Sequence, residues 1–143
     1  MRARRMTITA LLVLLASAAT LLSSAAPAAA DFCLEDNFSN IAVGKGFLVP
    51  SKGVCREFHG FIQDTSTALF GQACGSSDNK RITFRLTLMG PFDVAGYLFT
   101  LDRASLSGSG QLCQSDVVGS PGACSTITDI AKIACSPSIV PVP

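Results

Sequence analysis

The sequence predicts a mainly β fold: an antiparallel meander that forms a small sandwich or barrel and is stapled by disulfides. A short C-terminal helix is the alternative for the last element. Three observations support this prediction. Apolar and polar residues alternate in several short segments, as in half-buried strands. Turn-forming Gly, Ser, Asp and Pro residues separate these segments, and six cysteines lie in a short chain.

The first 30 residues predict a secretory signal peptide. Three arginines open the chain, no acidic residue precedes Asp31, and residues 10–22 form an uncharged apolar run. Small residues follow and end at Ala28-Ala29-Ala30, so we expect cleavage after Ala30, with cleavage after Ala28 as the alternative. A retained membrane anchor is disfavoured, because the run has 13 residues and a spanning helix needs about 20. The predicted location is therefore secreted, either extracellular or periplasmic.

The first predicted element of the mature chain is a hairpin. Val54–Gln63 is rich in aromatic and β-branched residues, and Leu69–Cys74 is its expected partner across the turn Asp64-Thr65-Ser66. No strand is predicted before Val54.

The next two elements carry the clearest strand signals. Arg81–Met89 alternates without a break between polar residues and Ile or Phe or Leu, and Gly90-Pro91 ends it. Tyr97–Asp102 repeats the pattern with Tyr97, Phe99 and Leu101 on one side. In a barrel, Phe84, Tyr97 and Phe99 are expected to line the interior, as packed core rather than as an apolar pocket.

The last elements are less regular. Leu106–Cys113 is predicted as a strand in which Gly108 and Gly110 mark a bulge or tight bend, and residues 119–122 are predicted as a loop. Ser125–Ala134 fits a strand by its Ile and Thr content, while Ile127, Ile130, Ala131 and Ala134 fit a helix by their spacing. The β context favours the strand.

Length and charge limit the classes of protein. Residues 31–136 are expected to form a single secreted β domain, and residues 137–143 a flexible tail rich in proline. Without the leader the chain has eight Lys and Arg against ten Asp and Glu. This mildly acidic chain has no basic cluster of the kind that binds nucleic acid, and no membrane partner is expected after signal removal.

The cysteines predict three disulfides, because a small exported domain needs covalent support in an oxidising compartment. Six cysteines allow fifteen pairings. Proximity in the chain favours Cys33 with Cys55, Cys74 with Cys113, and Cys124 with Cys135. No C-x-x-C pair is present, so neither a redox dithiol nor a zinc knuckle is indicated.

No catalytic set can be assembled from the sequence. His59, the single histidine, is a candidate general base beside Glu57 or a serine, but no G-x-S-x-G elbow accompanies it. The carboxylates form no recognisable pair, and several lie in turns, where Asp accepts backbone hydrogen bonds. We expect no cofactor and no metal site, with calcium in an acidic turn left open.

The resulting prediction is a non-enzymatic binding module for an unknown small ligand or extracellular protein. A small hydrolase that uses His59 is one alternative. The other is an inhibitor or toxin that presents residues 119–123 as a rigid loop inside the Cys113–Cys124 interval. The sequence names no binding residue and leaves the oligomeric state open.

Overall fold

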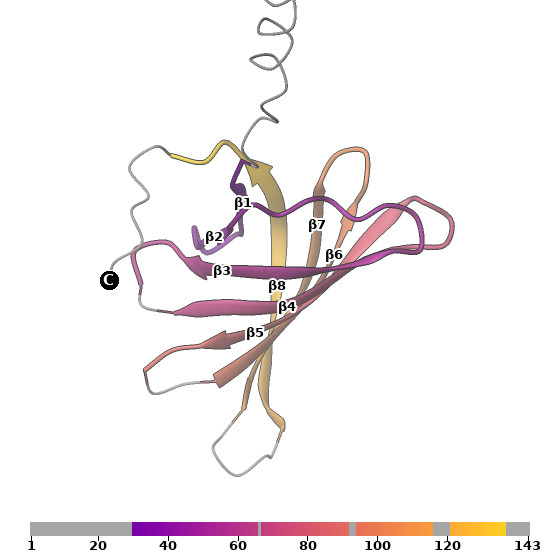
Figure 1. The fold of residues 1–143 in the computed structure, drawn as a ribbon. Helices are drawn as coiled ribbons and strands as arrows, with labels where there is room; N and C mark the ends of the chain where they lie inside the picture. Colours follow the sequence, from indigo (N-terminus) through magenta and orange to yellow (C-terminus); the bar gives the residue numbers. More distant parts are fainter. Residues whose placement is uncertain (1–29, 66, 92–93, 116–120, 137–143) are drawn as a thin grey trace, which may run out of the picture.

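The computed structural model describes residues 30–65, 67–91, 94–115 and 121–136. Within these ranges the chain forms a closed antiparallel barrel in which each strand pairs with the next and the last pairs with the first (Figure 1). The mainly β prediction is confirmed, and the barrel is the form that it takes. The eight strands are β1 Phe32–Glu35, β2 Ile41–Gly44, β3 Cys55–Ile62, β4 Ala68–Gly75, β5 Arg81–Met89, β6 Val94–Asp102, β7 Ser107–Ser115 and β8 Pro121–Ile133.

The predicted strands are all present. β5 has the predicted bounds, and β3, β4, β6 and β7 differ from the predicted segments by a few residues at their ends. β1 and β2 are additions that the sequence analysis missed. The predicted signal peptide and tail lie outside the described residues, apart from Ala30. So do residues 119 and 120 of the predicted loop, whereas Pro121 and Gly122 begin β8 and correct that prediction.

The last element is a strand, so the helix alternative is wrong. Its helix-like spacing has a structural cause: Ile127 and Ile130 pair with Gly110 and Gly108, so three residues of β8 span two of β7. Asp129 lies in this β-bulge with a positive φ of 54°. The bulge allows two isoleucines three positions apart to face the same core, where both are fully buried. A bulge or tight bend was predicted at Gly108 and Gly110; the register does shift between these two glycines, but the extra residue belongs to β8.

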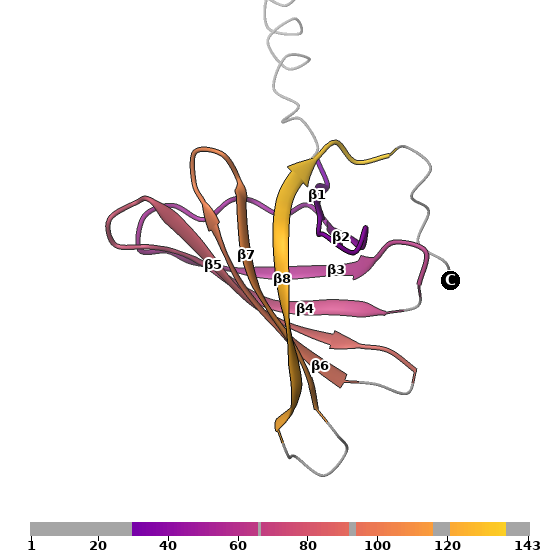
Figure 2. The same ribbon diagram turned by 180° about the vertical axis from the view of Figure 1, so that it is seen from behind.

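The barrel interior is filled. Tyr97, Phe99 and Phe84 follow one another with ring centroids 4.7 and 4.5 Å apart. Phe84 then contacts Phe58 and Phe47, and Phe47 contacts Phe32. This aromatic column confirms the prediction that Phe84, Tyr97 and Phe99 belong to a packed core. β3 and β8 cross at a steep angle in the views of Figures 1 and 2.

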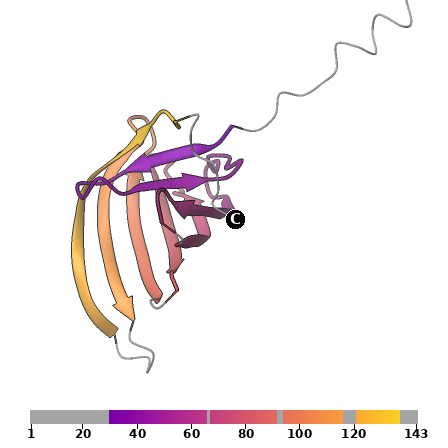
Figure 3. The same cartoon turned by 90° about the vertical axis from the view of Figure 1, so that its left-hand side faces the viewer.

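One end of the barrel is closed by the connection between β2 and β3. Phe47 and Pro50 of this connection are buried, and the Arg103 guanidinium donates a hydrogen bond of 2.8 Å from Nη1 to the Pro50 carbonyl oxygen. Backbone bonds between residues 53–54 and Gly75 fasten the connection to β4. We call this end, which also holds the start of β1 and the end of β8, the base. In the side view of Figure 3 the β1–β2 hairpin lies across the curved sheet formed by the later strands.

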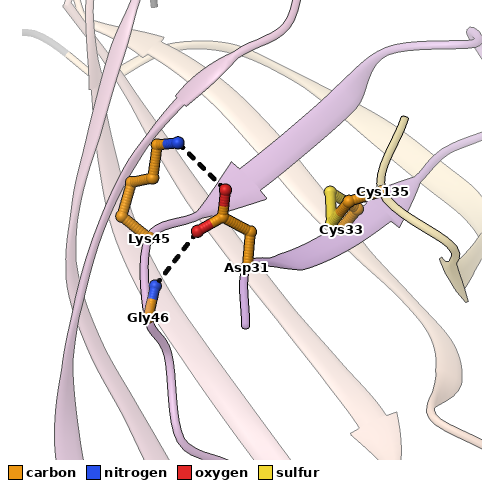
Figure 4. Close-up of a disulfide and its surroundings, with 5 residues drawn as sticks. All are labelled: Asp31, Cys33, Lys45, Gly46 and Cys135. Atoms are coloured by element: carbon orange, nitrogen blue, oxygen red, sulfur yellow. Dashed lines mark hydrogen bonds and ion pairs between the residues drawn. A yellow bond between two sulfur atoms is a disulfide. The ribbon is translucent and has the colours of Figure 1, made fainter. Parts of the chain in front are cut away.

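The disulfides correct the predicted pairing in all three pairs. Cys33 is bonded to Cys135 across 102 residues (Figure 4), Cys55 to Cys74 and Cys113 to Cys124. The last two pairs are direct cross-strand partners in β3–β4 and β7–β8. Distance along the chain misled the prediction, because the register of each hairpin decides which cysteines face each other. Three disulfides indicate an oxidising environment of the extracellular type.

Candidate ligand-binding site

The end of the barrel opposite the base holds a pocket. The β1–β2 and β3–β4 turns lie at this end, which we call the mouth. A pocket of about 200 Å³ opens there between the turns and the ends of the strands. Its described lining consists of Asp36, Asn40, Ile62, Thr65, Thr67, Leu88, Tyr97 and Leu112.

The floor of the pocket is apolar because four strands direct side chains inward at this level. Ile62 comes from β3, Leu88 from β5, Tyr97 from β6 and Leu112 from β7. Tyr97 ends the aromatic column, with its ring against Phe99. The inward-facing side of β5 and of β6 therefore contributes residues to the core along most of its length and to the pocket floor at the mouth end.

Tyr97 supplies the floor with one polar group. The side chain is only 7% exposed, and its hydroxyl has no hydrogen-bond partner within the described part of the chain. Burial raises the pKa of Tyr97 far above its ordinary range, and the nearby Asp36 carboxylate raises it further. The phenol is therefore neutral at physiological pH and offers both a donor and an acceptor to a ligand.

The rim of the pocket is polar and is held in place by its own turns. Asp36 Oδ1 accepts hydrogen bonds from the backbone N–H groups of Phe38 and Asn40, at 2.8 and 3.0 Å. Asp36 Oδ2 accepts a single bond of 3.2 Å, from Asn40 Nδ2. In the neighbouring β3–β4 turn, Thr65 Oγ1 donates to the Ile62 carbonyl oxygen and accepts from the Thr67 backbone N–H. These local bonds fix the rim before any ligand arrives.

His59 and Glu57, the residues of the hydrolase hypothesis, do lie together. His59 Nε2 is 3.2 Å from Glu57 Oε2, on the outer face of β3 and far more exposed than buried. A shallow groove beside them also includes Lys45, Arg56 and Phe47. Within the described residues, no hydroxyl group forms a hydrogen bond with the His59 ring. The pair thus has a base and an acid partner without a nucleophile, and the hydrolase hypothesis stays a prediction.

Other acidic residues serve the local structure. Asp31 binds Lys45 Nζ at 2.9 Å beside the Cys33–Cys135 disulfide (Figure 4). Asp78 and Asp102 accept backbone hydrogen bonds in their turns, as expected. No group of three or more His, Cys, Asp or Glu residues converges in the described ranges. The same ranges contain no helix of the length and apolarity that a membrane span requires.

The loop of the inhibitor hypothesis cannot be placed as a whole. Residues 119 and 120 lie outside the described residues, and residues 121–123 belong to β8. The sequence analysis missed the four rim residues, because Asp36, Asn40, Thr65 and Thr67 belong to two separate turns. Their only sequence signal is the turn composition of each segment. The pairing of β2 with β3, in which Ala42 lies opposite Ile62, brings the two turns together.

Comparisons with protein families, with curated proteins and with solved structures find no match to this chain.

Proposed function

We propose that the protein is an exported, non-enzymatic binding module that holds a small organic ligand, or the end of a larger one, in the mouth pocket. The observation that carries this proposal is the Tyr97 hydroxyl. It belongs to a residue that is 7% exposed, has no hydrogen-bond partner in the described residues, and lies in the floor of a pocket whose other floor residues are apolar. An apolar pocket with a few convergent polar groups is the usual form of a small-molecule site.

The size of the pocket limits the ligand. Sites for drug-sized molecules usually have about 300–1,000 Å³, whereas this pocket has about 200 Å³. The base is closed by Phe47 and the column above it is packed, so the ligand cannot extend further into the barrel. A short chain or a single small ring, with one polar group toward Tyr97, fits these limits.

The test uses 1-pentanol as a neutral probe and follows amide and side-chain shifts of the ¹⁵N- and ¹³C-labelled mature protein by NMR. We expect saturable shifts at Asn40, Thr67, Tyr97 and Leu112. Tyr97→Phe keeps the ring and removes the hydroxyl, so it should weaken binding about two- to tenfold.

Two tryptophan variants control for position. Thr67→Trp fills the mouth and should abolish the shifts. Leu98→Trp adds the same side chain at an exposed site on the outer face of β6 and should leave them unchanged. Shifts that miss the mouth, or that persist in Thr67→Trp, would contradict the proposal.

A further inference from the structure

Basic residues are absent from the mouth. No Lys or Arg occurs in residues 31–44, 57–79, 86–102 or 104–131, and these stretches include the β1–β2 and β3–β4 turns. Arg85 lies midway along β5, and the other basic residues of the described ranges lie at or near the base. They are Lys45, Lys52, Arg56, Lys80, Arg81, Arg103 and Lys132.

Acidic residues, by contrast, occur at or near the mouth without a counter-ion. Glu35 and Asp36 end β1 and begin its turn, Asp64 lies in the β3–β4 turn, and Asp129 lies in the β8 bulge beside the β1–β2 turn. Within the described ranges the ion pairs are Lys45–Asp31 and His59–Glu57, so none of these four carboxylates is paired. The mouth therefore presents a negative potential that no nearby cation cancels.

We infer that the mouth pocket selects small organic cations, and specifically a primary ammonium group on a short apolar chain. This inference rests on the binding function proposed above. The chain would occupy the floor made by Ile62, Leu88 and Leu112. The ammonium group would donate to Asp36 Oδ2, which accepts only one internal bond, and to the oxygen of Tyr97.

Two other classes of ligand fit the pocket less well. An anion such as a carboxylate would face Asp36, without a cation in the described lining to offset the repulsion. A calcium ion takes about six to eight oxygen ligands, while Asp36 is the single carboxylate in that lining and no acidic cluster is present in the described residues. The apolar floor also gives a bare metal ion nothing to contact.

The test compares three probes that share one chain and differ in charge: pentylammonium, 1-pentanol and pentanoate. At pH 7 and low salt, we expect pentylammonium to bind about fivefold more tightly than 1-pentanol, and pentanoate to bind most weakly. Asp36→Asn should bring the ammonium and alcohol affinities together, because amide oxygen can still accept the turn bonds. Asp78→Asn at the base is the matched control and should keep the preference.

The possible outcomes are distinguishable. If 1-pentanol binds at the mouth but pentylammonium binds no better, the cation inference is overturned and the binding function stands. If no probe shifts the mouth residues, the proposed function itself fails. Should Asp36→Asn not fold, the wild type still decides, since 0.5 M NaCl must reduce the ammonium preference and leave alcohol binding unchanged. If calcium chloride alone displaced pentylammonium from the mouth, the inference would be overturned in favour of a metal ion.

Discussion

At the scale of single residues, the Tyr97 hydroxyl marks the point where the packed core ends and the candidate site begins. Tyr97 and Phe99 lie on the same face of β6, both buried and in ring contact. The alternation of the strand predicted that both point inward. It could not predict that the Tyr97 oxygen would find no partner, because that depends on the turns that surround the mouth. The hydrogen-bond partners available to a side chain depend on the folded barrel around it and cannot be read from the strand's own sequence.

Asp102 gives a pH-dependent prediction at this scale. Its Oδ1 accepts hydrogen bonds from the backbone of Ala104 and Ser105, at 2.9 Å each, and from the Ser105 hydroxyl at 3.1 Å. The bonds from Ser105 are the main cause that lowers the pKa of Asp102 below its ordinary value. A carboxyl with a lower pKa in the folded state stabilises the protein above its unfolded pKa, near 4, and loses this effect as the pH falls through the folded value.

Asp102→Asn should therefore reduce the loss of thermal stability between pH 5 and pH 2.5. The melting temperature, followed by circular dichroism at both values, measures this. Part of the loss will remain in the variant, because hydrogen bonds also lower the pKa values of Asp31 and Asp78. A wild type and variant with parallel pH profiles would show that the Asp102 turn does not couple to folding.

At the scale of elements, strands with one solvent-exposed face and one buried face were predictable from the sequence. The short strands that are buried on both faces were not. β5 and β6 alternate because their outer face meets solvent. β1 and β2 are four residues long and buried at almost every position, so their sequences show no alternation. Cys33, for example, is buried against the chain end that it binds, and Val43 is buried beside it in the register. Such strands are recognisable only once their neighbours are known.

The candidate site was less predictable than the fold for a related reason. Its floor comes from four strands and its rim from two turns, so no sequence window contains more than a few of its residues. Tyr97 was placed in the interior correctly. Asp36 and Asn40 lie in a segment for which no element was predicted, and they form the β1–β2 turn.

Gly60 gives a prediction about strand packing. A side chain at this position of β3 would collide with the Val43 carbonyl oxygen of β2, which is backbone and cannot move aside without shifting the strand. Gly60→Ala should lower the free energy of unfolding by about 1–3 kcal/mol, as measured by urea denaturation. Gly96→Ala is the matched control, because nothing lies within 4 Å of its added carbon. Equal effects of the two variants would contradict the close approach of β2 and β3.

At the scale of the whole molecule, the disulfides differ in how much chain they enclose. Cys33–Cys135 spans 102 residues and joins the first strand to the segment after the last, whereas Cys113–Cys124 spans 11 residues within one hairpin. Loop-closure entropy assigns about 4.7 kcal/mol to the first bond and about 2.8 kcal/mol to the second. The long bond thus supports closure of the barrel, and the short one supports a pair of strands that already face each other.

Replacing each pair of cysteines by alanine tests this difference. Cys33→Ala/Cys135→Ala should lower the free energy of unfolding by about 2 kcal/mol more than Cys113→Ala/Cys124→Ala, in denaturant titrations without reductant. Intact mass spectrometry confirms that the remaining disulfides form in each variant. If the hairpin pair proved as costly to remove as the long one, the enclosed chain length would not govern the stability of this barrel.

The two ends of the barrel domain lie close together, and this has a practical consequence. Asp31 and Cys135 both lie at the base, tied close together through Cys33 (Figure 4), while the pocket opens at the far end of the barrel. A barrel domain attached to a bead, a sensor chip or a fusion partner through a linker just before Asp31 or just after Ser136 should therefore point its pocket toward the surrounding solution. The attachment points lie at the base of the barrel, and the pocket lies at the mouth.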